Sequence, residues 1–481
     1  MKKQAFNPYL PSYEYIPDGE PYVFGERVYV YGSHDKFAGE VFCQNDYVCW
    51  SAPIDKLYDW KYEGVIYRKK QDPYNKDGSR SLWAPDVQLG LDGRYYLYYA
   101  LDGHGIISVA ICDTPVGEYQ YYGSVKYSNG KVVGEEKGDI FQFDPAIFID
   151  DDQRIFLYSG IGPENNEKID KWVQGRRYEG AYCIELEKDM LTVKAEPKVI
   201  IPKVGFAEGT GYEGHEFFEA SSMRKIGDTY YFIYSSFKSH ELCYARSNRP
   251  DGDFKYGGTI ISNGDIGLDA TSVVEGVNYT GNNHGSIINI KGQWYVFYHR
   301  QTNRHTFSRQ GCAEKITIDE KGNIPQVEMT SCGLNEGPLE GKGSYATYIA
   351  CNLYSKEGAV FYSFDLKEEY ENHPAFTQSG EDREQNGDQY ISGMRDGSVA
   401  GFKYFKLEDT TKITIEVRGN AVGIVSVLSD REGKEIASIP VKAEEGYSLF
   451  SSELHAGEEI SALFFKYHGS GVLDFKTFIL E

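Results

Sequence analysis

The residue that most clearly suggests chemistry is Glu219, which directly follows Phe217 and Phe218. A carboxylate among aromatic side chains is costly to ionise, so we expect its pKa to be raised. A carboxyl group with a raised pKa can act as a general acid near neutral pH. The surroundings of Glu219 therefore predict proton donation to a leaving group.

Two further carboxylates complete a plausible reaction. Asp18 is followed by Gly-Glu-Pro, a polar turn in which the carboxylate should stay ionised as a base. Asp144, in Phe-Asp-Pro-Ala, would add negative charge that keeps Glu219 protonated and orients it. A pair of carboxyl groups with separated pKa values suits glycoside hydrolysis, which needs an acid on the leaving oxygen and a second carboxylate across the bond.

These acids belong to a layout that occurs five times within residues 1–320. In each copy a polar residue, here called the head, precedes by ten to twelve residues an aromatic residue in a strand-like run. The heads are Asp18, Asp86, Asp144, Glu219 and His284, and the matching aromatics are Tyr29, Tyr96, Phe156, Tyr231 and Tyr295. One Asp at a strand start is usually only a turn residue, but five equivalent heads favour a shared site. Repeats of this length, made of short strands, predict a five-bladed β-propeller with the heads around its axis.

The predicted blade order also bears on stereochemistry. Asp18 and Glu219 head the first and fourth blades, which are not adjacent in a ring of five. We therefore expect the two carboxyl groups to face each other with room for a water molecule, which gives inversion of configuration. Trp83, near the head Asp86, is either a core residue or a stacking wall for a sugar. Both Trp83 and Asp86 are candidates for substrate binding.

The overall composition indicates an all-β chain. Aromatic residues make up 15%, with 40 Tyr, and 52 Gly allow many turns. The aromatic repeat stops near residue 351, after a Gly-rich stretch typical of a linker. We expect a propeller over residues 1–320, a linker over 321–350 and a β-sandwich over 351–481. None of the five Trp lies in this last part, which weakens the case for a strong sugar-binding surface there.

Charge and sorting signals narrow the partners. The net charge of −22 argues against nucleic acid and anionic membranes, so a neutral oligosaccharide is expected. Two lysines near the start are not followed by an apolar run, and no stretch reaches transmembrane length. Eight cysteines without a Cys-x-x-Cys pair favour free thiols in the cytoplasm. A cytoplasmic hydrolase would meet short oligosaccharides, so we expect exo action on chain ends.

The motifs around the heads resemble glycoside hydrolase family 43, whose members are five-bladed propellers that hydrolyse with inversion and mostly release arabinofuranose or xylose. The resemblance implies that Asp18 is the base, Asp144 the pKa-modulating acid and Glu219, in Phe-Glu-Ala-Ser-Ser, the general acid. One departure is that Gly19 follows Asp18 where the family usually has Pro.

The same resemblance extends to three further features. His284, in Asn-Asn-His-Gly-Ser, is similar to the axial His that often lies beside a bound calcium ion, and no organic cofactor is implied. Arg309, in Ser-Arg-Gln-Gly, resembles an Arg that contacts sugar hydroxyls. Residues 376–481 look like a family 6 carbohydrate-binding module.

Two alternatives remain at this level. A glycoside phosphorylase on the same propeller would need basic residues to hold phosphate, which the acidic heads disfavour. A non-catalytic sugar-binding propeller would have no need of carboxyl groups with separated pKa values.

Overall fold

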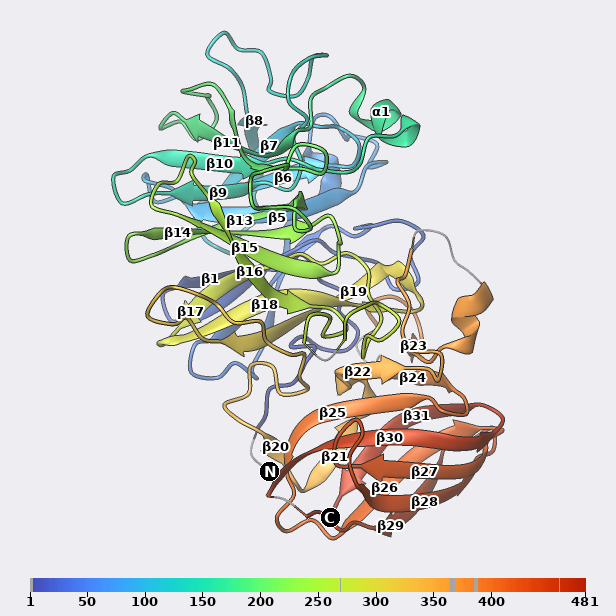
Figure 1. Ribbon diagram of the computed structural model, residues 1–481. Coiled ribbons are helices and arrows are strands. Elements are labelled where there is room, and N and C mark those ends of the chain that lie inside the picture. Colours follow the sequence, from blue (N-terminus) through green and yellow to red (C-terminus); the bar gives the residue numbers. More distant parts are fainter. Residues whose placement is uncertain (1–2, 269, 364–367, 385–387, 458) are drawn as a thin grey trace.

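The computed structural model describes residues 3–268, 270–363, 368–384, 388–457 and 459–481 (Figure 1). The all-β prediction is confirmed, since α1 (Glu167–Val173) is the one α-helix in these ranges. Three short 3-10 helices accompany it: η1 (Lys69–Gln71), η2 (Thr347–Ile349) and η3 (Glu368–Asn372). No helix in the described ranges has both the length and the apolar character that crossing a membrane requires.

The first two thirds of the chain form five antiparallel sheets, here called sheets 1 to 5, each built from consecutive strands. Sheet 1 contains β1 (Glu20–Phe24), β2 (Arg27–Tyr31), β3 (Tyr47–Pro53) and β4 (Lys61–Tyr67). Sheet 2 contains β5 (Leu82–Leu89), β6 (Tyr95–Leu101), β7 (Ile107–Cys112) and β8 (Gln120–Ser124). Sheet 3 contains β9 (Ala146–Ile149), β10 (Ile155–Ser159), β11 (Gly180–Leu186) and β12 (Lys198–Pro202). Sheet 4 contains β13 (Phe217–Ile226), β14 (Thr229–Ser236), β15 (Glu241–Ser247) and β16 (Lys255–Ser262), and sheet 5 contains β17 (Ser286–Ile290), β18 (Gln293–Thr302) and β19 (His305–Ile316).

The aromatic strands are buried on both faces, because each sheet packs between two others. In β14, Tyr230, Phe232 and Tyr234 pack against sheet 3. The alternate residues Tyr231 and Ile233 pack against sheet 5. Successive side chains on a strand point to opposite faces, so a continuous aromatic and β-branched run fits a sheet covered on both sides.

The five sheets follow one another around a ring of contacts. Separate hydrophobic clusters join sheets 1 and 2, 2 and 3, 3 and 4, and 4 and 5, and a fifth cluster joins sheet 5 back to sheet 1. The first strands make the same circuit: β1 contacts β5, β5 contacts β9, β9 contacts β13, β13 contacts β17, and β17 contacts β1. The starts of these five strands are thereby brought towards a common centre.

The last third of the chain forms two six-stranded sheets, drawn in orange and red in Figure 1. One contains β20 (Leu339–Glu340), β22 (Asn352–Tyr354), β25 (Val399–Lys406), β27 (Val422–Leu428), β28 (Glu435–Lys442) and β30 (Ile460–Ser470). The other contains β21 (Gly343–Ala346), β23 (Ala375–Ser379), β24 (Asp388–Met394), β26 (Lys412–Gly419), β29 (Ser448–Glu453) and β31 (Leu473–Leu480). Both sheets contribute to one hydrophobic core, which includes Phe402 and Phe465 from the first and Phe475 and Phe478 from the second.

The segment 321–350, expected to be a linker, contains strands of these C-terminal sheets. β20 pairs with β25, and β21 pairs with β31. The composition of the segment is Gly-rich, but its few apolar residues, such as Leu339 and Tyr345, are buried in the C-terminal core. From Leu339 onward, strands of this segment thus belong to the C-terminal sheets.

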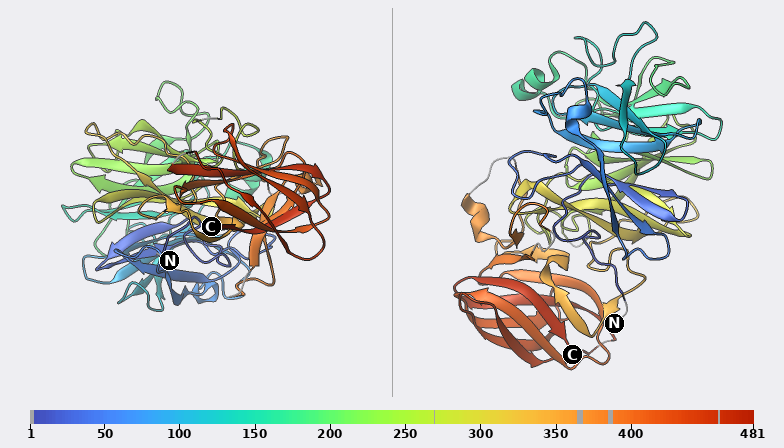
Figure 2. Two further views of the ribbon diagram at one scale, coloured as in Figure 1. Left: turned by 90° about the horizontal axis from the view of Figure 1, so that it is seen from below. Right: turned by 180° about the vertical axis from the view of Figure 1, so that it is seen from behind.

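The N-terminal segment returns to this C-terminal part, so both termini lie at the same end of the molecule (Figure 1, Figure 2). Gln4 Nε2 donates to Tyr345 Oη at 3.3 Å. Asn7 Nδ2 donates to Glu314 Oε1 on β19 at 2.7 Å. The N-terminal segment thus contacts both sheet 5 and the C-terminal sheets.

Candidate active site

A cavity of about 490 Å³ opens at the starts of the first strands of the ring. This volume lies within the range of roughly 300–1,000 Å³ found for small-ligand sites. Six of the seven site residues predicted from the sequence line it: Asp18, Trp83, Asp144, Glu219, His284 and Arg309. Residues far apart in the chain are therefore gathered in one place, and Asp86 alone of the seven lies outside.

Asp18 stands two residues before β1, in a left-handed conformation with φ of 56°. Its carboxylate is buried and receives a hydrogen bond from Arg309 Nη1 at 3.1 Å. Burial opposes ionisation, but Arg309, His299, His284 and Ser33 together outweigh it and lower the pKa of Asp18 below the usual carboxyl range, with Arg309 making the largest favourable contribution. The carboxyl group of Asp18 is thus held in its ionised form.

A neutral histidine fixes the backbone of Asp18. Burial lowers the pKa of His299 to about 3, so its ring is uncharged. The Nδ1 atom then accepts from the Asp18 N–H at 3.3 Å, while Nε2 lies 2.8 Å from the carbonyl of Asn282. Because one ring nitrogen accepts and the other donates, this tautomer satisfies both contacts.

Arg309, on β19, is held by a second acid that the sequence analysis did not assign. Its Nε and Nη2 atoms donate to the two carboxylate oxygens of Asp35 at 2.8 and 3.0 Å. The guanidinium also lies 4.5 Å from the ring centre of Phe42. A two-pronged pairing of this kind sets the plane of the guanidinium, which leaves Nη1 directed at Asp18.

Glu219 is the third residue of β13 and is half-buried at the cavity. Its enclosure, followed by the negative charge of Asp144, raises its pKa to about 8. His284 acts in the opposite direction but does not outweigh these two effects. Glu219 therefore carries a proton at neutral pH, as a general acid must.

Asp144 and His284 form a buried pair between the base and the acid. Asp144 Oδ2 accepts from the backbone N–H of Ala220 at 3.1 Å and lies 3.5 Å from His284 Nδ1. Burial lowers the pKa of His284, but the hydrogen bond and charge of Asp144 raise it to about 9. Since Ala220 follows Glu219 directly, Asp144 both fixes the backbone of the acid and supplies charge beside it.

Aromatic side chains form the walls of the cavity. Trp83 packs against Phe143, with ring centres 5.1 Å apart, and lies 6.3 Å from Trp172 of α1. Phe218, next to the acid, also lines the cavity. Trp83 thus both packs against other aromatic rings and lines the cavity. Aromatic faces of this kind suit the apolar faces of sugar rings.

The C-terminal third of the chain also contributes to the cavity. Phe361, which is 39% exposed, lines it beside Tyr362. This segment is paired to the loop before β17, because Thr280 N donates to Val360 O at 3.1 Å and Tyr362 N donates to Thr280 O at 2.7 Å. The wall opposite the ring of sheets is therefore made by residues that follow β22.

Asp86 does not line the cavity, which corrects the expected substrate-binding role. Its carboxylate accepts from Tyr22 Oη at 2.7 Å and from the Ile147 N–H at 2.7 Å, and so joins sheets 1, 2 and 3. In register, Asp86 pairs with Tyr98 as Glu20 pairs with Tyr31. Asp86 therefore corresponds to Glu20, and Ala84 stands where the matching head would be.

The surroundings of His284 leave few free carboxylates for the calcium ion suggested by the sequence. Calcium takes six to eight oxygen ligands, to which water can contribute, and two of the three carboxylates that interact with His284 are already matched by other cations. Asp18 pairs with Arg309, and Glu20 pairs with Arg224 at 2.8 Å. A protonated imidazole beside Asp144 offers no ligand from the nitrogen that faces the pair. The positive charge at the centre is thus supplied by side chains.

Three contributors to the site were missed from the sequence. Asp35 comes four residues after the end of β2, and nothing in its local sequence marks it as a partner of Arg309. Trp172 lies in the polar stretch 161–180, where α1 was not expected. Phe361 lies beyond the repeats, and nothing in its local sequence indicates that it returns to the cavity. Only Trp172, as a Trp in an otherwise polar segment, carried a usable signal.

A protonated carboxyl group and an ionised carboxylate in one aromatic-walled cavity constitute the machinery of a glycoside hydrolase. Residues 15–324 match the model of glycosyl hydrolases family 43, and the chain belongs to this family.

Two relatives agree with this placement, one of them over the whole chain. The chain is 52% identical over 483 residues to a "Xylosidase/arabinosidase" of Thermoclostridium stercorarium, covering 100% of this chain and 99% of the relative. It is 31% identical to a "Xylosidase/arabinosidase" of Bacteroides ovatus over 66% of this chain and 97% of the relative.

Solved structures show the same fold. A family 43 β-xylosidase/α-arabinofuranosidase from a compost microbial metagenome, in complex with xylotriose and in a calcium-free form, is 26% identical with a TM-score of 0.51, over 68% of this chain and 98% of that one. A family 43 arabinoxylan arabinofuranohydrolase from Bacillus subtilis has a TM-score of 0.51 at 20% identity, over 98% of this chain and 97% of that one, and so supports the fold alone.

Proposed function

We propose that this protein is an inverting, exo-acting glycosidase that releases arabinofuranose, xylose or both from short neutral oligosaccharides. The observation that carries the proposal is the opposite ionisation of two carboxyl groups in one cavity, with the pKa of Asp18 lowered and that of Glu219 raised to about 8. The names of the two xylosidase/arabinosidase relatives support the choice of sugars.

In the proposed mechanism, water attacks the anomeric carbon in one step. Asp18 takes a proton from the water, and Glu219 gives its proton to the leaving oxygen. Asp144 keeps Glu219 protonated and fixes the backbone at Ala220. Arg309 helps to keep Asp18 ionised, and because it lines the cavity we also assign it to contact with sugar hydroxyls. No step requires a metal ion or an organic cofactor.

The ring of sheets supports a five-bladed propeller as the catalytic domain, over residues 1–320. Contacts from β17 back to β1 support closure of the ring. In a ring of five blades, Asp18 belongs to the first and Glu219 to the fourth. The fifth blade lies between these two, so they are not neighbours. Asp144 raises the pKa of Glu219 more strongly than Asp18 does, as expected if Asp18 is the more distant acid. This arrangement favours inversion.

The two C-terminal sheets and their shared core support a β-sandwich module, similar to a family 6 carbohydrate-binding module. We propose that its main contribution lies at the cavity, where Phe361 narrows the opening. A site walled on that side accepts a chain end more readily than the middle of a long polysaccharide, which supports exo action.

The role of Glu219 can be tested with substrates of different leaving groups. Glu219→Ala should lower kcat/KM by roughly two to four orders of magnitude for an oligosaccharide, the usual contribution of a general acid. The loss of kcat/KM should be smaller for nitrophenyl arabinofuranoside and nitrophenyl xyloside, because their leaving groups need less protonation. Glu208→Ala, an exposed acid in the loop before β13, serves as the control. Full activity of Glu219→Ala on the oligosaccharide would rule out this role.

A further inference from the structure

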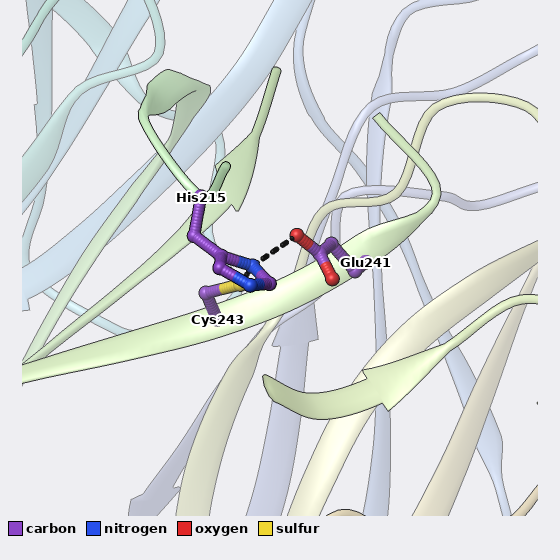
Figure 3. A group of neighbouring side chains, drawn as sticks. All are labelled: His215, Glu241 and Cys243. Atoms are coloured by element: carbon purple, nitrogen blue, oxygen red, sulfur yellow. Dashed lines mark hydrogen bonds and ion pairs between the residues drawn. The ribbon is translucent and has the colours of Figure 1, made fainter. Parts of the chain in front are cut away.

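A second cluster of reactive side chains lies in sheet 4, apart from the cavity. His215, Glu241 and Cys243 bring an imidazole, a carboxylate and a thiol within 4.8 Å of one another (Figure 3). His215 Nδ1 is 2.7 Å from Glu241 Oε1 and 3.9 Å from Cys243 Sγ. None of the three residues lines the catalytic cavity.

The spacing suits a small tetrahedral cation. Zinc binds nitrogen and oxygen at about 2.0–2.2 Å and sulfur at about 2.3 Å, so its ligand atoms lie roughly 3.3–3.7 Å apart. The nitrogen–oxygen contact of 2.7 Å would have to open by roughly 0.6–1.0 Å, and the nitrogen–sulfur contact of 3.9 Å would have to close by roughly 0.2–0.6 Å. Both changes are within the reach of side-chain rotation.

The strand and its neighbours position the three donors in advance. Glu241 and Cys243 are two residues apart on β15, so they share one face of the sheet. The ring of His215 stacks on Tyr256, with centres 4.6 Å apart and planes at 17°. The carbonyl of His215 accepts from Tyr234 Oη at 2.7 Å. These two contacts hold the loop that carries His215 against sheet 4.

Outer contacts support the carboxylate but leave the thiol weakly engaged. Ser236 Oγ donates to Glu241 Oε1 at 2.6 Å, and Thr259 Oγ1 donates to Oε2 at 3.1 Å. Hydrogen bonds of this kind orient carboxylate ligands in metal sites. Two contacts of the thiol are long, 3.7 Å to Thr259 Oγ1 and 3.9 Å to His215 Nδ1. Tyr256 and Glu241 also interact with the thiol, and a metal–sulfur bond would be a stronger interaction than any of these.

The residues around the cluster show how a cation could reach it and which group would compete with that cation. Cys243 is fully buried, whereas the side chain of His215 is 27% exposed and gives a route from solvent. Lys238 Nζ lies 3.6 Å from Glu241 Oε1, and its side chain is 36% exposed. This ammonium group occupies the charge position that a cation would take, and it can swing into solvent.

We propose that His215, Glu241 and Cys243 form a binding site for a borderline transition-metal cation of the zinc type. A nitrogen, oxygen and sulfur set of this kind selects such a cation over calcium or magnesium, which prefer oxygen ligands. The thiol proton passes to solvent when the metal–sulfur bond forms. The bound cation ties the loop before β13 to β15, within the sheet that carries Glu219.

Cobalt(II) is a spectroscopic probe for this site, because a cysteine–cobalt bond produces a charge-transfer absorption in the near ultraviolet. Titration of the metal-free full-length protein with cobalt chloride should produce this band with one equivalent bound, and zinc should remove it. Cys243→Ser should abolish the band, and His215→Ala should weaken binding at least roughly tenfold. Cys112→Ser, at the end of β7, should leave the band unchanged.

A variant that is expected to strengthen metal binding distinguishes a metal site from a hydrogen-bonded pair that binds no metal. Lys238→Gln removes the competing ammonium group but leaves the three proposed ligands unchanged, so it should tighten cobalt binding. Zinc should raise the Tm of the wild-type protein but not that of Cys243→Ser. No band in the wild type, or a band that persists in Cys243→Ser, would overturn the proposal.

Discussion

At the scale of single residues, the proposed catalysis depends on neighbouring charges that separate the pKa values of two similar carboxyl groups. Asp18 and Glu219 have nearly the same intrinsic acidity. Arg309 lies 3.1 Å from Asp18, whereas Asp144 adds negative charge near Glu219. The same cavity therefore holds one carboxyl group ionised and the other protonated.

This separation predicts a pH profile with a defined alkaline limb. The acid must be protonated, so activity is present below the pKa of Glu219 and is lost as the pH rises through about 8. Asp144→Asn removes the negative charge but keeps an acceptor for the Ala220 N–H, so it should lower the pKa of Glu219. The alkaline limb of kcat/KM should move to lower pH by roughly one unit.

Asp152→Asn, in an exposed turn, provides the control and should leave the limb in place. The measurement is kcat/KM against pH with a nitrophenyl substrate. A limb that stays where it is, or moves to higher pH, in Asp144→Asn would show that Asp144 does not keep Glu219 protonated.

The spacing of the repeats correctly predicted that most site residues lie together. The exception is Asp86, and its different position has a physical reason. Asp18, Asp144 and His284 each stand two residues before the first strand of their sheet. Asp86 is the fifth residue of β5, and by register it lies two residues beyond the matching position, which is occupied by Ala84. A shift of two keeps a side chain on the same face of a strand but moves it along the axis. Asp86 therefore joins the sheets below the cavity.

At the scale of elements, a short helix fixes one wall of the cavity. α1 has seven residues, and Asn166 caps its start by accepting from the backbone N–H groups of Lys168 and Ile169 at 3.0 and 3.1 Å. Its Trp172 packs against Phe141, with ring centres 4.6 Å apart. So short a helix is marginal by itself, and its order depends on this cap and on the aromatic packing.

Removal of the cap should therefore weaken substrate binding at a distance. Asn166→Ala should cost about 1 kcal/mol of helix stability and raise KM severalfold with little change in kcat. Asn166→Asp keeps the acceptor and adds a charge that suits a helix start, so it should behave as the wild type. Equal KM values for the Ala variant and the wild type would show that α1 does not position the wall.

The sequence could not reveal α1 because its stabilising interactions are not local. The stretch 161–180 is polar and charged, which is typical of a surface loop. The helix is completed by contacts between Trp172 and aromatics of the segment before β9. The strands of sheets 1 to 5 were easier to predict, since each repeats the same aromatic run.

At the scale of the whole molecule, the C-terminal third is part of the active site. Phe361 reaches the cavity because Val360 and Tyr362 pair with Thr280 of the loop before β17. The same third contributes Lys403, whose Nζ lies 2.7 Å from Glu328 and 3.4 Å from Asp265. These contacts hold the C-terminal sheets against the ring of sheets.

Loss of the Phe361 ring should therefore affect binding more than chemistry. Phe361→Ala should raise KM for xylo-oligosaccharides roughly two- to tenfold, the range expected for one aromatic contact of about 0.5–1.5 kcal/mol, with kcat nearly unchanged. Phe237→Ala is a matched control, because Phe237 is also 39% exposed but lies outside the cavity. The same KM in both variants would remove Phe361 from the substrate site.

The division of the chain was foreseeable only in outline. The end of the aromatic repeat marks the change from the ring to the C-terminal sheets, as the sequence indicates. The segment 321–350 is Gly-rich, yet β20 and β21 pair with strands more than sixty residues away in the chain. Such distant pairing depends on the assembled core and has no local signature.

The central claim is a single displacement in which Asp18 activates water and Glu219 protonates the leaving oxygen. Proton NMR of the first sugar released, recorded before mutarotation equilibrates the anomers, tests it most directly. The account predicts that this sugar has the anomeric configuration opposite to that of the substrate. A first product that keeps the configuration of the substrate would require a covalent intermediate and would contradict the assignment of Asp18 as the base.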